Sequence, residues 1–134
     1  MCMLSRSELR KICMTCLYQI DILKQNNLSY DPEEILKENL SVENEFVKDI
    51  VYGVITDEKE IDEIANKYLK DWDIKRLDKT GASILRMAIY ELKYMDTPSI
   101  VVINEAVELA KQYTDEELVK MINAVLDKFM KEEL

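Results

Sequence analysis

Apolar residues recur every three or four positions in three stretches of the second half of the chain. These stretches cover residues 84–92, 102–110 and 118–130. Each has the spacing of the buried face of an α-helix. Pro98 separates the first two, and a capping box that begins at Thr114 separates the last two, because proline ends a helix and a capping box starts one. The pattern predicts three consecutive helices that pack directly against one another.

The first half of the chain carries four more stretches with helical spacing. Ser5 and Glu8 form a capping box before the first, and Asp31 followed by Pro32 is a typical start for the second. No stretch alternates for long enough to indicate a β-strand. The sequence predicts an all-α protein of about seven helices, in a single domain of residues 1–134. These four stretches cover residues 9–23, 32–40, 46–55 and 61–69.

Charge is unevenly distributed along the chain. The net charge is -9, and residues 25–66 alone hold 12 Asp/Glu against 3 Lys/Arg. Residues 1–24 and 67–96 each carry a small excess of Lys and Arg. An acidic body repels polyanions in general, so any RNA-binding site on this chain must be local.

Residues that carry out catalysis are scarce in the sequence. Histidine is absent, which removes the commonest general base and metal ligand, and neither glycine lies in a phosphate-binding loop. We therefore expect a non-enzymatic protein without cofactor or metal. No apolar run is long enough to span a membrane, and the amino terminus lacks the pattern of a signal peptide. With three cysteines, which fit a reducing compartment, the chain is predicted to be soluble and cytoplasmic.

Two arginines near the amino terminus are candidate phosphate ligands. Arg6 and Arg10 lie one helical turn apart on one face, and the planar guanidinium group suits phosphate oxygens. Lys11 adds a neighbouring positive charge. The competing interpretation, favoured for the arginines taken alone, is a solvated helix face with a salt bridge to Glu8.

Two other polar features have a structural and a functional interpretation. Cys13 and Cys16 form a CxxC pair on the apolar side of a predicted helix, which favours core packing over redox or zinc chemistry. Asn104 and Glu105 adjoin core positions of another helix. They are either an ordinary face at the solvent boundary, which we favour, or a buried pair with Arg86 as a partner.

Three blocks of the sequence resemble the NusB family of transcription antitermination factors. The first runs from Arg6 to Tyr18 and resembles the family's arginine-rich start. The second, ILRMAIYEL at residues 84–92, is close to the family's ILRxAxYEL. The third, VINEAVELAK at residues 102–111, is followed by NAVLDK at residues 123–128. The blocks occur in the family's order and cover nearly the whole chain.

The resemblance implies a non-enzymatic RNA-binding protein made of two small helical bundles. Members of the family bind the boxA element of ribosomal RNA operon transcripts together with NusE, a small-subunit ribosomal protein. The complex joins other Nus factors on RNA polymerase and suppresses premature termination. Matching motif positions implies RNA contacts at Arg6, Arg10, Tyr68, Glu117, Lys120 and Met121, to which Lys11 is added for its charge. The family's NusE surface implies partner contacts near Arg76, Lys79 and Arg86.

Two alternatives to this interpretation are open at the level of sequence. One is the NusB-like module of ribosomal RNA cytosine methyltransferases. The other is a helical protein–protein adaptor that has the fold but does not bind RNA. Family members include monomers and dimers, so a homodimer is also open.

Overall fold

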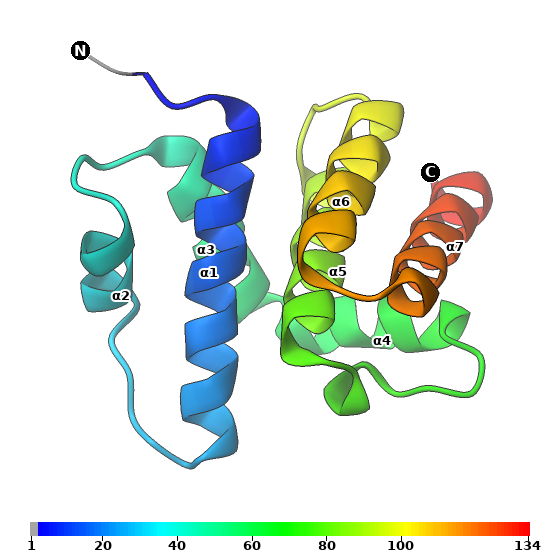
Figure 1. Cartoon of the computed structure of the whole chain (residues 1–134), viewed down its shortest axis with the longest axis horizontal. Coiled ribbons are helices and arrows are strands. Elements are labelled where there is room, and N and C mark those ends of the chain that lie inside the picture. The colour runs from blue at the N-terminus through cyan, green and yellow to red at the C-terminus, as the bar shows by residue number, and fades with distance from the viewer. Residues whose placement is uncertain (1–2) are drawn as a thin grey trace.

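The computed structural model describes residues 3–134, which form seven α-helices and one short 3-10 helix (Figure 1). No strand occurs among these residues, so the all-α prediction is confirmed. None of the helices in this part of the chain is long and apolar enough to cross a membrane. The helices are α1 (Arg6–Gln25), α2 (Pro32–Asn39), α3 (Glu45–Thr56), α4 (Glu58–Tyr68), η1 (Ile74–Arg76), α5 (Lys79–Tyr94), α6 (Ser99–Tyr113) and α7 (Glu116–Glu133).

Side chains at the helix starts fix where several helices begin. The predicted capping box at Ser5 is present: its hydroxyl accepts from the Glu8 N–H, and the Ser5 N–H donates to the Glu8 carboxylate. The predicted cap at Thr114 is wrong by one residue. The Thr114 hydroxyl donates to a carbonyl at the end of α6, whereas the Asp115 carboxylate accepts from the Leu118 N–H and starts α7. A carboxylate at the N-cap also interacts favourably with the helix dipole.

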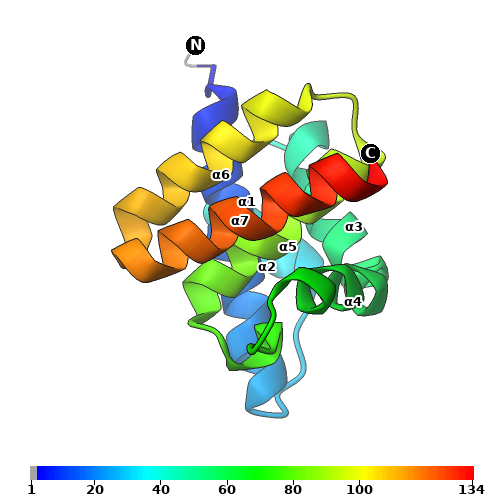
Figure 2. The same cartoon turned by 90° about the vertical axis from the view of Figure 1, so that its right-hand side faces the viewer.

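Two small bundles meet at α5, which confirms the predicted architecture. Helices α1 and α3 contact one side of α5, with α2 against α1, and helices α4, α6 and α7 contact the other (Figures 1 and 2). The buried residues of α5 form an unbroken run from Gly81 to Ile89 and continue at Glu91 and Leu92. Because α5 is enclosed on nearly all sides, Arg86 and Glu91 are buried with the apolar residues and need charged partners.

Two glycines allow α5 to lie close to its neighbours. A Cβ atom on Gly53 of α3 would lie 2.2 Å from the ring of Tyr90. A Cβ atom on Gly81 in the first turn of α5 would lie 2.4 Å from the end of Leu118. Both distances are shorter than van der Waals contact. A side chain at position 53 would displace the Tyr90 ring, whereas one at position 81 would meet the flexible end of Leu118, which can rotate away.

The two cysteines of the CxxC pair are part of the core. Cys13 and Cys16 are fully buried within α1, and burial raises the pKa of the Cys16 thiol to about 11. A protonated, buried thiol is a poor nucleophile and a poor metal ligand. The prediction that these residues pack in the core is confirmed.

Candidate nucleic-acid interface

A groove lies between the end of α4 and the first half of α7. Its volume is about 330 Å³, and it also includes the loop that follows α4. Three of the residues predicted to touch RNA line it, namely Tyr68, Glu117 and Met121. Lys120 is exposed on the same part of α7. The structure thus brings together residues that are about fifty positions apart in the sequence. The lining residues are Tyr68, Leu69, Lys70, Asp71, Trp72, Glu117, Met121, Ala124, Val125 and Lys128.

The ring of Tyr68 lies at the base of this groove and is largely buried. Only 8% of the residue is exposed, and the ring packs against Phe129 with a centroid separation of 6.4 Å. Its hydroxyl donates to the Glu133 carboxylate, which raises the pKa of Tyr68 and lowers that of Glu133. The RNA contact at Tyr68 that the family resemblance implies stays a prediction, since Tyr68 lines the groove but leaves little of its surface exposed.

Trp72 is the exposed aromatic residue of this groove, and the sequence analysis missed it. It follows α4 in the loop before η1, and 52% of the residue is accessible to solvent. It is the only tryptophan in the chain. A large aromatic residue inside an irregular, charged stretch could have been recognised as a candidate contact, since core residues follow the helical period and Trp72 does not.

Two of the predicted cationic residues on α1 remain at the surface. Arg6 is exposed, and its guanidinium carbon lies 4.1 Å from the centroid of the Phe46 ring. Lys11 is exposed, with its Nζ atom 5.3 Å from the centroid of the Tyr113 ring. Tyr113 ends α6 directly before the connection to α7. Lys11 therefore lies near the connection between α6 and α7.

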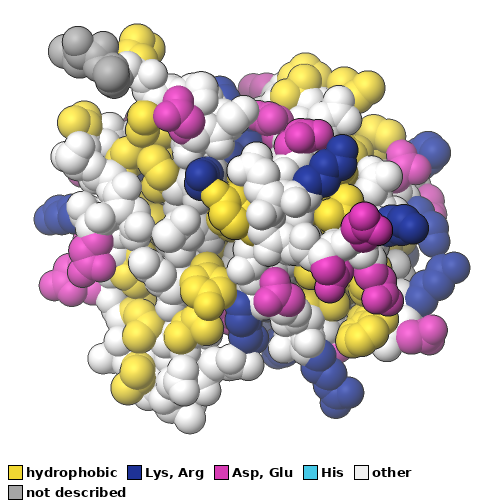
Figure 3. Space-filling view, viewed as in Figure 1, with side chains coloured by type: hydrophobic (Ala, Val, Ile, Leu, Met, Phe, Trp, Pro, Cys, Tyr) yellow, Lys and Arg dark blue, Asp and Glu magenta, His cyan; other side chains and the backbone are white. Residues whose placement is uncertain are grey.

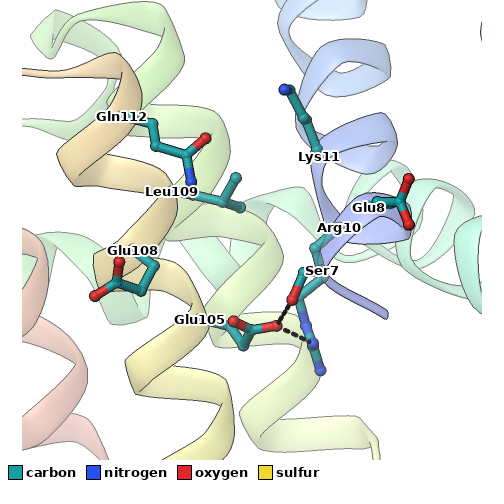
Figure 4. A pocket seen from close by; sticks show the side chains of 8 residues that line it. All are labelled: Ser7, Glu8, Arg10, Lys11, Glu105, Glu108, Leu109 and Gln112. Carbon is teal, nitrogen blue, oxygen red and sulfur yellow. Dashed lines mark hydrogen bonds and ion pairs between the residues drawn. The ribbon is translucent and has the colours of Figure 1, made fainter. Parts of the chain in front are cut away.

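Arg10 is buried, which corrects the prediction that it shares an outer face with Arg6. It donates from Nε and Nη2 to the two carboxylate oxygens of Glu91, at 2.9 and 2.5 Å. Its Nη1 atom donates to Glu105 at 3.1 Å, and the Ser7 hydroxyl bonds to the same carboxylate (Figure 4). Burial opposes the positive charge, but the carboxylates outweigh it and raise the pKa of Arg10. Position 10 faces α5 and α6, so its charge links helices and is withdrawn from solvent.

The predicted partner-binding residues fall into two groups. Arg76 is exposed on η1. Arg86 has only 6% of its side chain exposed and forms a two-point ion pair with Asp62, at 2.8 and 3.2 Å. Both Arg86 and Lys79 also reach Asp21 of α1. The favoured interpretation of Asn104 and Glu105, a helix face at the solvent boundary, agrees with the structure: Asn104 is exposed and Glu105 is partly exposed. The alternative, in which Arg86 is the partner of this pair, does not hold, because Glu105 pairs with Arg10 and Arg86 pairs with Asp62.

The face of the molecule shown in Figure 3 does not present a large field of one sign. Basic and acidic side chains are mixed over the helices on the right, and charged side chains are fewer on the left. Mixed charge gives little long-range attraction for a polyanion. A nucleic-acid site here depends on individual cations and on the groove.

The fold and the candidate site are typical of a helical nucleic-acid-binding protein. The described residues form an all-helical protein whose candidate site offers exposed Lys, Arg and Trp side chains. They contain no cluster of three metal-ligating side chains. Such a site has the groups that bind phosphates and bases rather than those that break covalent bonds.

Comparison with known proteins gives the family. The NusB family model matches residues 7–131, and the chain belongs to the NusB family of transcription antitermination proteins. The transcription antitermination protein NusB of Staphylococcus aureus (strain JH9) is 42% identical over 130 residues, covering 96% of this chain and 100% of that protein. These relatives are antitermination factors, which agrees with the prediction of a non-enzymatic protein and favours it over a methyltransferase module.

Solved structures agree with this assignment. NusB of T. maritima has a TM-score of 0.84 and 31% sequence identity, with 98% of this chain and 94% of that chain covered. A crystal structure described as antitermination factors NusB and NusE in complex with dsRNA has a TM-score of 0.81 and 28% identity, with 94% of this chain and 96% of that chain covered. The helical arrangement is therefore that of the family.

Proposed function

We propose that this protein binds boxA-type single-stranded RNA in ribosomal RNA operon transcripts, together with a NusE-type ribosomal protein. The complex then joins other Nus factors on RNA polymerase in the cytoplasm and suppresses premature termination. The observation that carries the proposal is the groove between Trp72 and Met121, with Lys120 exposed beside it on α7. Family membership and the related NusB–NusE structure bound to RNA support the same partners.

The proposed RNA site divides into phosphate contacts and a base contact. Arg6, Lys11 and Lys120 are exposed cations and supply the phosphate contacts, which fix position without reading sequence. The groove supplies the base contact. An unpaired base exposes its flat apolar face, whereas in a duplex that face is stacked against neighbouring bases and is not accessible. The RNA therefore runs from the start of α1 past the beginning of α7.

The proposed NusE contact uses the surface around η1 and α5. Arg76 is the accessible cation there and can contact the partner directly. Lys79 and Arg86 act through Asp21 and Asp62, since their ion pairs hold α1, α4 and α5 together beneath that surface. Substitution of Arg86 should therefore lower the stability of the fold, and any loss of partner affinity should follow from that.

A titration with boxA-type RNA, with and without NusE, tests the proposed function. Lys120→Glu should weaken RNA binding. The plot of log K against log salt should become less steep by about one, as expected for a lost phosphate contact. Lys37→Glu is the matched control: it makes the same charge change on α2, in the other bundle. Equal effects of the two variants would contradict a local site. NusE binding without any RNA binding would instead make the protein an adaptor.

A further inference from the structure

Trp72 occupies an unusual position for the only tryptophan of the chain. Tryptophan is the largest aromatic side chain and is usually highly buried, yet 52% of Trp72 is exposed. The loop between α4 and η1 carries it to one wall of the groove, and α7 forms the opposite wall with Met121. The indole therefore presents aromatic surface to the space where the proposed RNA site lies.

The groove is suited to an uncharged, flat group rather than to a phosphate. Its charged lining residues balance one another, with Lys70 and Lys128 against Asp71 and Glu117. The remaining lining is mainly apolar and includes Leu69, Met121, Ala124 and Val125. A phosphate gains little from balanced charges, whereas a nucleobase gains from apolar and aromatic contact.

Tyr68 lines this groove but offers little stacking surface, because only 8% of the residue is exposed. Its ring lies against Phe129, and its hydroxyl is held by Glu133. Among the described residues that line the groove, Trp72 is the other aromatic side chain. Most of the aromatic surface available to a ligand in the groove is therefore that of Trp72.

We propose that Trp72 is the platform on which one unpaired RNA base stacks in this groove, between the indole and the α7 wall at Met121. The inference rests on the proposed function and adds a base-contacting residue to it. Base–aromatic stacking accounts for roughly 5- to 100-fold in affinity when the aromatic group is removed. Stacking does not depend on which base is present, so Trp72 contributes affinity, while sequence preference comes from other contacts.

Tryptophan fluorescence tests the proposal directly, because the protein has one tryptophan. Single-stranded boxA-type RNA is titrated into the full chain without the ribosomal protein, at low salt. Binding is measured in parallel by a method that does not use tryptophan, such as anisotropy of a labelled RNA. Stacking should quench the Trp72 emission with the same midpoint as the anisotropy change. Oligonucleotides with one abasic residue at successive positions should lose the quenching at one position.

Three substitutions separate stacking from apolar contact. Trp72→Phe keeps an aromatic ring and should bind nearly as well as the parent. Trp72→Leu keeps apolar bulk and should bind as weakly as Trp72→Ala, roughly 5- to 100-fold below the parent. That loss should disappear with the RNA that is abasic at the stacked position. Circular dichroism and thermal unfolding check that the variants fold, which an exposed position favours.

The outcomes distinguish this inference from the proposed function. If RNA binds and Lys120→Glu weakens it, but Trp72 emission is unchanged and Trp72→Ala binds normally, the inference is wrong and the proposed function stands. If the label reports no RNA binding by the parent protein with or without NusE, both are wrong. Equal binding by Trp72→Leu and Trp72→Phe would show apolar contact without stacking and would also overturn the inference.

Discussion

Replacing Arg10 by methionine should lower the stability of the protein by far more than the loss of a surface arginine would. Methionine fills similar space without the charge and leaves the Glu91 carboxylate, with 1% of its side chain exposed, without its two-point partner. Breaking a buried ion pair from one side typically costs about 3–5 kcal/mol of stability. For a chain of this length that corresponds to a fall of roughly 10–20 °C in Tm. Urea and thermal unfolding followed by circular dichroism measure both quantities.

A double substitution and a control identify the cause of that loss. Arg10→Met combined with Glu91→Leu removes both charges, and its stability should return to within about 1 kcal/mol of the parent, since apolar replacement of a buried pair is often neutral. Arg6→Met is the control one turn earlier. It removes an exposed cation that lies over Phe46 and should cost about 0.5–1 kcal/mol.

Equal stability of Arg10→Met and Arg6→Met would show that the buried ion pair does not stabilise the fold. A double variant no more stable than Arg10→Met alone would show that the loss does not arise from the unpaired Glu91 carboxylate.

Two further predictions concern packing and acid stability. Gly53→Ala places a Cβ atom 2.2 Å from the Tyr90 ring and should cost about 1–3 kcal/mol in urea unfolding; the same change in a Tyr90→Ala background should cost little, and an equal cost there would contradict the contact. The pKa of Glu133 is held below its usual 4.5 by the Tyr68 hydroxyl, so its stabilising contribution is present above that pH and is lost as the pH falls through the folded pKa. Tyr68→Phe should make the urea midpoint less sensitive to acid, and an unchanged decline would show that this hydrogen bond does not contribute.

The helices could be predicted from the sequence because their cause is local. A stripe such as that of residues 118–130 repeats with the helical period, and it forms α7 almost as predicted. The cap of α7 was misplaced by one residue, since Thr114 and Asp115 both have side chains that can cap a helix. The end of α6 decides between them: the Thr114 hydroxyl donates a hydrogen bond to the Ala110 carbonyl, so Asp115 caps α7.

The ion pairs inside the fold could not be predicted because their cause is not local. Arg10 and Glu91 are 81 positions apart, and each looks like an ordinary polar residue on an amphipathic helix. Glu91 is buried because α5 is enclosed by both bundles, a fact that appears only when the helices are assembled. The same holds for Arg86, whose partner Asp62 lies on a different helix.

The burial of Arg10 changes how α1 can take part in RNA binding. Of its three predicted cations, Arg6 and Lys11 remain exposed, and each lies over an aromatic ring, Phe46 or Tyr113. A cation that already rests on a ring loses less side-chain freedom when it meets a phosphate. With fewer phosphate contacts, less of the binding free energy comes from counterion release. More of it must then come from the base-binding groove, which is where Trp72 lies.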